Sequence, residues 1–121
     1  MIAFLTFTKE TVDIPLDSCY TNSSDPKSII ASRACYNHID SELLLRIAKC
    51  ESGFNPNARN KHSTASGLFQ FIDSTFINQA QAREIEWTDK NDPEIQAELA
   101  ARMIADGGLG HWNASRNCWD K

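Results

Sequence analysis

The chain has 121 residues, which is enough for one ordinary domain and too few for two independent hydrophobic cores. Hydrophobic residues make up 41% and charged residues 23%, with five Gly and four Pro, so a disordered or fibrous chain is excluded. The formal net charge is −4 and no basic run occurs, which argues against a nucleic-acid-binding protein. No apolar run approaches the roughly 18 residues that a transmembrane helix requires, so we expect none.

The N-terminal residues 1–7 are apolar but do not resemble a convincing signal peptide. The run is short, has no basic residues before it, and is followed at once by Lys9 and Glu10. We expect an ordered first strand here, with the remnant of a longer precursor as the alternative. Residues 8–24 are expected to be irregular.

Two Asp-Pro pairs predict where two helices begin. Asp25-Pro26 and Asp92-Pro93 each combine a capping side chain with a proline suited to the first helical position. The first helix is expected to extend to about Tyr36. The second is expected to stop at Gly107-Gly108, because glycine commonly follows the end of a helix.

Two further helices are predicted in the middle of the chain. One begins at Asp40, and the other runs from residue 73 or 74 to about residue 83 with Asp73 as its cap. Residues 52–67 have the composition of a long connection, and residues 68–72 are either a strand or an extended approach to the next helix. Four helices with little strand propensity between them predict a mainly α domain.

The four cysteines favour disulfide bonds over a metal site. Their number is even and none forms a C-x-x-C pair. Three pairings are possible. We favour the one that ties the N-terminal segment to the first helix and the C-terminus to the second helix, Cys19–Cys35 with Cys50–Cys118. Disulfides would place the protein outside the cytosol, whereas four free thiols in a cytosolic protein are the alternative.

Glu51 interrupts the apolar stripe of the second helix. Leu44, Ile47 and Ala48 fall at helical spacing, and Glu51 occupies the i+7 place where an apolar residue is expected. Partial burial and the negative end of the helix dipole both raise the pKa of a carboxyl group there, which suits a general acid. An ion pair with a nearby basic residue (Arg46, Lys49 or Arg59), or a side chain that simply reaches into solvent, is the structural alternative.

Two sequence blocks around this glutamate resemble a known enzyme family. Residues 50–58 read C-E-S-G-F-N-P-N-A, and residues 65–72 read A-S-G-L-F-Q-F-I. They are similar to the E-S-G-x-N-P-x-A and G-L-x-Q segments of lysozyme-like lytic transglycosylases. Cys50 and the segment 107–118 also resemble small secreted forms such as resuscitation-promoting factors, in which the matching cysteines are joined. The resemblance covers about residues 40–118. Two departures are an Asp at position 73, where Pro is common, and the lack of a clear match to the later E-N-I and Tyr motifs.

This resemblance implies a fold and a domain organisation. The fold is expected to be lysozyme-like, of the α+β class and mainly α. Residues 40–121 would form the catalytic domain. Residues 1–39 would form an extension with one helix packed on the core.

The resemblance also implies a reaction carried out by one carboxyl group. Glu51 would protonate the β-1,4 glycosidic oxygen between N-acetylmuramic acid and N-acetylglucosamine in peptidoglycan. It would then take a proton from the muramoyl C6 hydroxyl, which gives a 1,6-anhydro product. Most glycosidases use two carboxylates. Asp73 is the nearest candidate for a second one here, and it fits a helix cap better.

The candidate substrate-binding residues come from the same blocks. Gln70 and Ser66 match cleft positions of the family, and Gly67 would allow substrate amides to approach its neighbouring carbonyls. Phe69 and Trp112 are further candidates, although Phe69 fits the core better and Trp112 fits either role.

The expected partner is the glycan strand of peptidoglycan, bound by a monomer. The protein would be secreted, periplasmic or associated with the cell wall. The three His residues are far apart in the sequence, so neither a metal nor another cofactor is expected. Two alternatives remain open: a hydrolytic muramidase of the same fold, and a peptidoglycan-binding module without catalytic activity.

Overall fold

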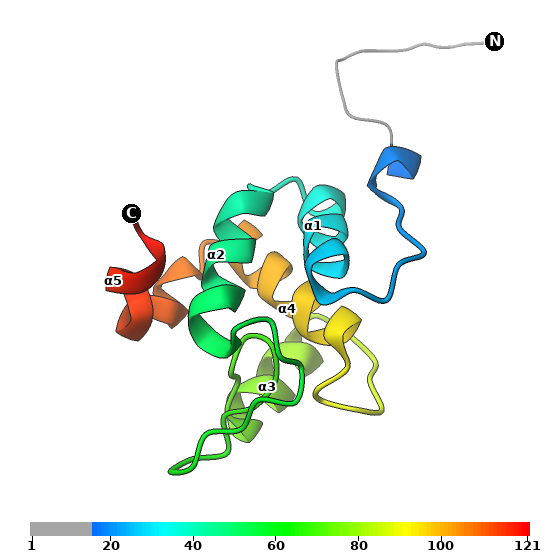
Figure 1. Ribbon diagram of the computed structural model, residues 1–121. Coiled ribbons are helices and arrows are strands. Elements are labelled where there is room, and N and C mark those ends of the chain that lie inside the picture. The colour runs from blue at the N-terminus through cyan, green and yellow to red at the C-terminus, as the bar shows by residue number, and fades with distance from the viewer. Residues whose placement is uncertain (1–15) are drawn as a thin grey trace, which may run out of the picture.

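A computed structural model describes residues 16–121, and the strand expected at residues 1–7 lies outside this range. Helices dominate the described chain (Figure 1). Their order is η1 (Leu16–Cys19), α1 (Pro26–Tyr36), α2 (Ser41–Ser52), α3 (Asp73–Ala82), α4 (Pro93–Ala105), η2 (Leu109–Ser115) and α5 (Arg116–Trp119), where η denotes a 3-10 helix. The four predicted helices are confirmed. The two short helices after residue 108 were not predicted, and neither was η1, which lies in the stretch expected to be irregular.

Residues 67–70 form a hydrogen-bonded turn in which the Gln70 N–H donates to the Gly67 carbonyl at 3.3 Å, so the prediction of a strand or an extended approach at residues 68–72 is wrong. Between residues 16 and 121, β-structure is limited to two isolated antiparallel bridges, Arg59–Ser66 and Ser66–Phe71. These bridges fold the long connection back on itself before α3. The mainly α prediction therefore holds for the described chain.

Three helices begin as their capping residues predict, and the fourth does not. The side chains of Asp25, Asp40 and Asp92 each accept a hydrogen bond from a backbone N–H in the first turn that follows. For α3 the capping residue is Ile72, which makes no side-chain cap bond, so the prediction that Asp73 caps this helix is wrong. The Asp73 carboxylate instead accepts a hydrogen bond from Lys90 Nζ at 2.8 Å, a contact that only the tertiary fold provides.

The hydrophobic core lies where α1, α2 and α4 meet. Helix α1 packs against both α4 and α2. Side chains with no solvent exposure line this junction, among them Ile30 on α1, Leu44 and Ile47 on α2, and Leu99 on α4. The helix of the predicted N-terminal extension thus buries its apolar residues in the same core as α2.

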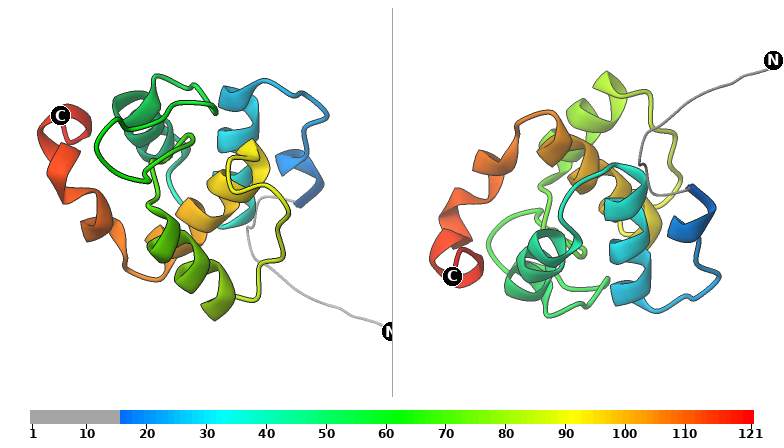
Figure 2. Two further views of the ribbon diagram at one scale, coloured as in Figure 1. Left: turned by 90° about the horizontal axis from the view of Figure 1, so that it is seen from below. Right: turned by 90° about the horizontal axis from the view of Figure 1, so that it is seen from above.

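Two disulfide bonds tie the ends of the chain to this core. Cys19–Cys35 joins η1 to α1, with the Cα atoms 5.4 Å apart, and Cys50–Cys118 joins α2 to α5, with the Cα atoms 6.0 Å apart. The favoured pairing is confirmed. Residues 109–119, called here the C-terminal segment, pack on α2 at the opposite end of the domain from η1 (Figures 1 and 2). Within residues 16–121, no helix is long and apolar enough to cross a bilayer.

Candidate active site

Glu51 lies in the last turn of α2. The helix ends at Ser52, and the next residue, Gly53, adopts a left-handed conformation (φ 62°) and donates its N–H to the Lys49 carbonyl at 2.9 Å. Glu51 lies one turn after the buried residues Ile47 and Ala48 on the same face of α2, and it is itself half-buried. The Cys50–Cys118 disulfide, one residue away, fixes the C-terminal segment beside it. The sequence places the carboxyl group at the edge of the core, and the structure agrees.

Burial raises the pKa of Glu51 above its ordinary value, and a hydrogen bond from the Ser115 hydroxyl partly offsets this by lowering the pKa. The Ser115 Oγ to Glu51 Oε2 distance is 2.5 Å. A raised pKa is what the sequence predicts for this residue. The alternative partners are not used: Arg46 Nε donates to the Trp119 carbonyl at 2.9 Å, and no ion pair within residues 16–121 includes Glu51.

The C-terminal segment holds Ser115 in place through Trp112. The Trp112 carbonyl accepts a hydrogen bond from Trp119 Nε1 at 3.1 Å and lies 3.3 Å from Ser115 Oγ. Both tryptophan side chains are 2% exposed. The turn that presents Ser115 to Glu51 is therefore anchored by two buried tryptophans.

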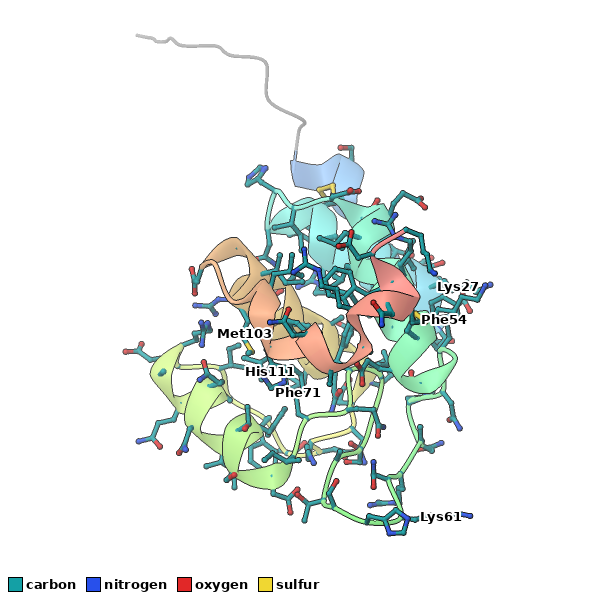
Figure 3. All side chains as sticks on the ribbon, turned by 90° about the vertical axis from the view of Figure 1, so that its left-hand side faces the viewer. Lys27, Phe54, Lys61, Phe71, Met103 and His111 are labelled. Atoms are coloured by element: carbon teal, nitrogen blue, oxygen red, sulfur yellow. A yellow bond between two sulfur atoms is a disulfide. The ribbon has the colours of Figure 1, made fainter. Side chains whose placement is uncertain are left out.

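Trp112 also connects this segment to residues 53–72, called here the site loop. Trp112 Nε1 donates to the Phe69 carbonyl at 3.2 Å, and the rings of Phe69 and Phe71 approach Trp112 edge to face. Phe71 also contacts His111, with ring centroids 5.5 Å apart, and Figure 3 shows these two residues side by side. Burial lowers the pKa of His111, so its neutral form is favoured. The C-terminal segment thus links the two motif blocks, residues 50–58 through the Cys50–Cys118 disulfide and residues 65–72 through Trp112.

The predicted substrate-binding residues of the site loop, Gln70 and Ser66, form hydrogen bonds within the protein. Gln70 Nε2 donates to the carbonyls of Ala58 and Gly67, at 3.2 and 3.0 Å, which cross-links the loop. Ser66 is 3% exposed, and its hydroxyl donates to Asn91 Oδ1 at 2.8 Å. The Ser66 side chain points into the protein, so the expectation that it contacts sugar directly is corrected.

Gly67 allows a close internal contact within the protein. Its φ is +86°, and a Cβ at this position would lie 2.4 Å from Gln96 Nε2. Gln96 is fully buried, accepts a hydrogen bond from the Phe69 N–H at 3.0 Å, and donates to the carbonyls of Ser66 and Lys90. Because Gly67 has no Cβ, the Gln96 side-chain amide can lie directly against its backbone.

Phe69 and Trp112 also differ from their predicted substrate-binding role. Their side chains are 0% and 2% exposed, so neither ring offers a face on which a sugar can stack. They are part of the framework between the site loop and the C-terminal segment. Within the described range, no group of three or more His, Cys, Asp or Glu is arranged to hold a metal ion.

Two residues of this region were missed by the sequence reasoning. Ser115 carried a usable signal, because it lies three residues before Cys118, whose predicted partner Cys50 is next to Glu51. Gln96 is a polar residue on the buried face of α4, three and four residues before Leu99 and Ala100, and this position also suggests a specific role.

The arrangement, one half-buried carboxyl group with a raised pKa in a small helical domain, is suited to general acid–base chemistry. Comparison with known proteins defines the family. The transglycosylase SLT domain matches residues 28–114, and the chain belongs to this family. Its fold is lysozyme-like, as the sequence predicts.

Curated relatives carry a related name. The probable transglycosylase SceD proteins of Staphylococcus aureus strains Newman, USA300 and COL are 40% identical to this chain over 70 residues. The aligned region covers 57% of this chain and 30% of each relative. The chain thus matches less than a third of the length of these relatives.

Proposed function

We propose that this domain is a peptidoglycan lytic transglycosylase in which Glu51 is the only acid–base residue. The proposal rests chiefly on the half-buried Glu51, whose pKa is raised by burial and which stands in the E-S-G segment that resembles the family, within the residues matched by the SLT domain. The bond cleaved would be the β-1,4 linkage between N-acetylmuramic acid and N-acetylglucosamine. Membership of the SLT family supports this class of substrate.

The proposed reaction has two proton transfers through one side chain. Protonated Glu51 gives its proton to the glycosidic oxygen as the bond to the muramoyl C1 breaks and positive charge develops on the sugar. The N-acetyl group of the substrate assists at C1. The Glu51 carboxylate then takes the proton of the C6 hydroxyl while O6 bonds to C1. The product is a 1,6-anhydro sugar, no water is consumed, and Glu51 is protonated again.

The contacts of Asp73 support a mechanism with a single carboxyl group. Its carboxylate is bonded to Lys90 Nζ at 2.8 Å, and its side chain is 60% exposed. The Asp73 carboxylate is thus engaged in a surface ion pair that ties the start of α3 to Lys90. We therefore assign Asp73 a structural role.

The substrate site would lie between Glu51 and the site loop. Gln70 and Gly67 would shape this surface through the loop backbone that they fix, with Phe69, Ser66 and Trp112 supporting it from inside. We further propose that the protein acts as a monomer on glycan strands outside the cytosol. The two disulfides support that location.

Digestion of purified peptidoglycan sacculi tests this function. The wild-type protein should release muropeptides with 1,6-anhydro ends, which are lighter by one water than hydrolysis products in mass spectrometry. Glu51→Gln should lower the rate by at least about 1,000-fold, because a single group performs both proton transfers. Asp73→Asn makes the same chemical change at an exposed site and should keep near wild-type activity.

Other outcomes identify the alternatives. Products with ordinary reducing ends would show a hydrolytic muramidase and overturn the transglycosylase assignment. Glycan binding without turnover in both wild type and Glu51→Gln would show a wall-binding module instead.

A further inference from the structure

Ser115 differs from the other groups around Glu51 because its hydroxyl contacts the carboxyl group directly. The hydroxyl has one hydrogen to donate and two acceptors within reach. Glu51 Oε2 is at 2.5 Å and the Trp112 carbonyl is at 3.3 Å. The shorter distance is typical of a hydrogen bond to a charged oxygen, so the hydrogen points to Oε2.

We propose that Ser115 is a positioning residue that keeps Glu51 Oε2 as a hydrogen-bond acceptor and so leaves Oε1 as the oxygen that carries the transferred proton. This inference rests on the proposed function, since it specifies which atom of Glu51 acts as acid and then as base. In the acid form, Oε2 is the carbonyl oxygen and accepts from Ser115. In the base form, the same bond stabilises the carboxylate.

The bond also keeps the carboxyl group in one orientation between the two steps. Without it, the proton could reside on either oxygen and the group could rotate about its last side-chain bond. Holding a reacting group in a productive geometry accounts for large rate effects in enzymes. Ser115 is itself held on the turn whose carbonyl, that of Trp112, is bonded to Trp119 Nε1.

The other charged and titratable groups on α2, η2 and α5 either make contacts with residues other than Glu51 or face solvent. On α2, Arg46 donates to the Trp119 carbonyl, and Lys49 is exposed. On α5, Arg116 pairs with Asp120 at 2.9 Å. On η2, His111 contacts the rings of Phe71 and Trp112. Burial and the Ser115 hydroxyl are the causes that set the pKa of Glu51. A change at Ser115 should therefore be read out directly at Glu51.

The test compares Ser115→Ala with Ser115→Thr and with Ser32→Ala. The Ser32 hydroxyl donates to the Cys19 carbonyl at 2.7 Å, so Ser32→Ala also removes one internal hydroxyl bond but does so away from Glu51. Ser115→Thr keeps a hydroxyl at the site. Two quantities are measured: kcat and KM on soluble uncrosslinked peptidoglycan strands, and the Glu51 titration followed by 13C NMR of its carboxyl carbon. The Glu51→Gln protein identifies the NMR signal.

Ser115→Ala should lower kcat about tenfold with little change in KM, because a bond to a charged group is lost without loss of a substrate contact. It should also raise the pKa of Glu51, which moves the high-pH decline of activity to higher pH. Ser115→Thr should recover most of the rate, and Ser32→Ala should change neither quantity.

Two results would overturn the inference while leaving the proposed function intact. One is an active wild type whose Ser115→Ala variant has unchanged kcat and an unchanged Glu51 titration. The other is an equal loss of rate in Ser115→Ala and Ser32→Ala, which would reveal a general stability effect. An inactive wild type would instead overturn the proposed function, and with it the catalytic role of Ser115.

Discussion

The helical core and the region around Glu51 are held together in different ways. At the junction of α1, α2 and α4, fully buried aliphatic side chains such as Ile30, Leu44 and Leu99 pack together, and the polar contact between Arg33 and Glu98 is only partly buried. Around Glu51, a disulfide joins α2 to the C-terminal segment, and backbone groups of Phe69 in the site loop bond to the side chains of Trp112 and Gln96. Apolar contacts tolerate substitution if volume is kept, whereas each polar bond has one suitable partner. The site should therefore be more sensitive than the core to single changes.

The largest expected effect comes from removing the disulfide on the site side. Replacing both Cys50 and Cys118 by Ala opens a 68-residue separation and should cost about 4 kcal/mol of unfolding free energy in the chain-entropy model. The change should also abolish most activity, because the C-terminal segment carries Ser115. Urea denaturation and digestion of sacculi measure the two effects.

The disulfide on the opposite side provides the matched control. Replacing Cys19 and Cys35 by Ala opens a separation of 16 residues and should cost about 3 kcal/mol. Activity of the folded protein should stay near that of wild type. An equal loss of activity in the two double variants would contradict the distinction between the two regions.

A smaller effect is expected at Gly67. An added methyl group would overlap the buried Gln96 amide at a φ of +86°, so Gly67→Ala should destabilise the protein by about 3 kcal/mol. Gly107 has a similar φ of +92° but open space around it, so Gly107→Ala should cost only about 1 kcal/mol. The free energy of unfolding of both variants, measured by chemical denaturation, distinguishes the cost of overlap with Gln96 from the cost of backbone strain. Equal losses would mean that the Gln96 contact adds nothing.

The smallest expected effect concerns the pH dependence of stability at Glu51. Because burial raises its pKa above 4.5, the folded state binds this proton more tightly than the unfolded state does. Stability from this group is therefore present below pH 4.5 and falls as the pH rises through the raised pKa. Glu51→Gln cannot ionise, so its melting temperature relative to wild type should increase between pH 4 and pH 7. A constant difference across that range would show that Glu51 titrates normally.

Helix positions were predictable because their signals are local. An aspartate followed by proline caps a helix within four residues, and the breaks at Gly53 and Gly107 need only a left-handed backbone. Asp73 shows the limit of this reasoning. It has the chemistry of a cap, yet Lys90, 17 residues later in the chain, takes its carboxylate.

The catalytic candidate Glu51 and its partial burial were also predictable from the sequence, because an acidic residue within the apolar stripe of a helix is expected to lie at the edge of the core. Its surroundings were not. The roles of Ser66, Gly67 and Phe69 depend on Gln96 and Trp112, which are distant in sequence and meet the loop only after α4 and the C-terminal segment pack. Residue types and spacings fix helices, caps and the choice of acid, because these depend on neighbours along the chain. Whether a loop side chain points inward, as Ser66 does toward Asn91, or outward to a substrate depends on long-range packing. The amino-acid sequence alone does not reveal that packing.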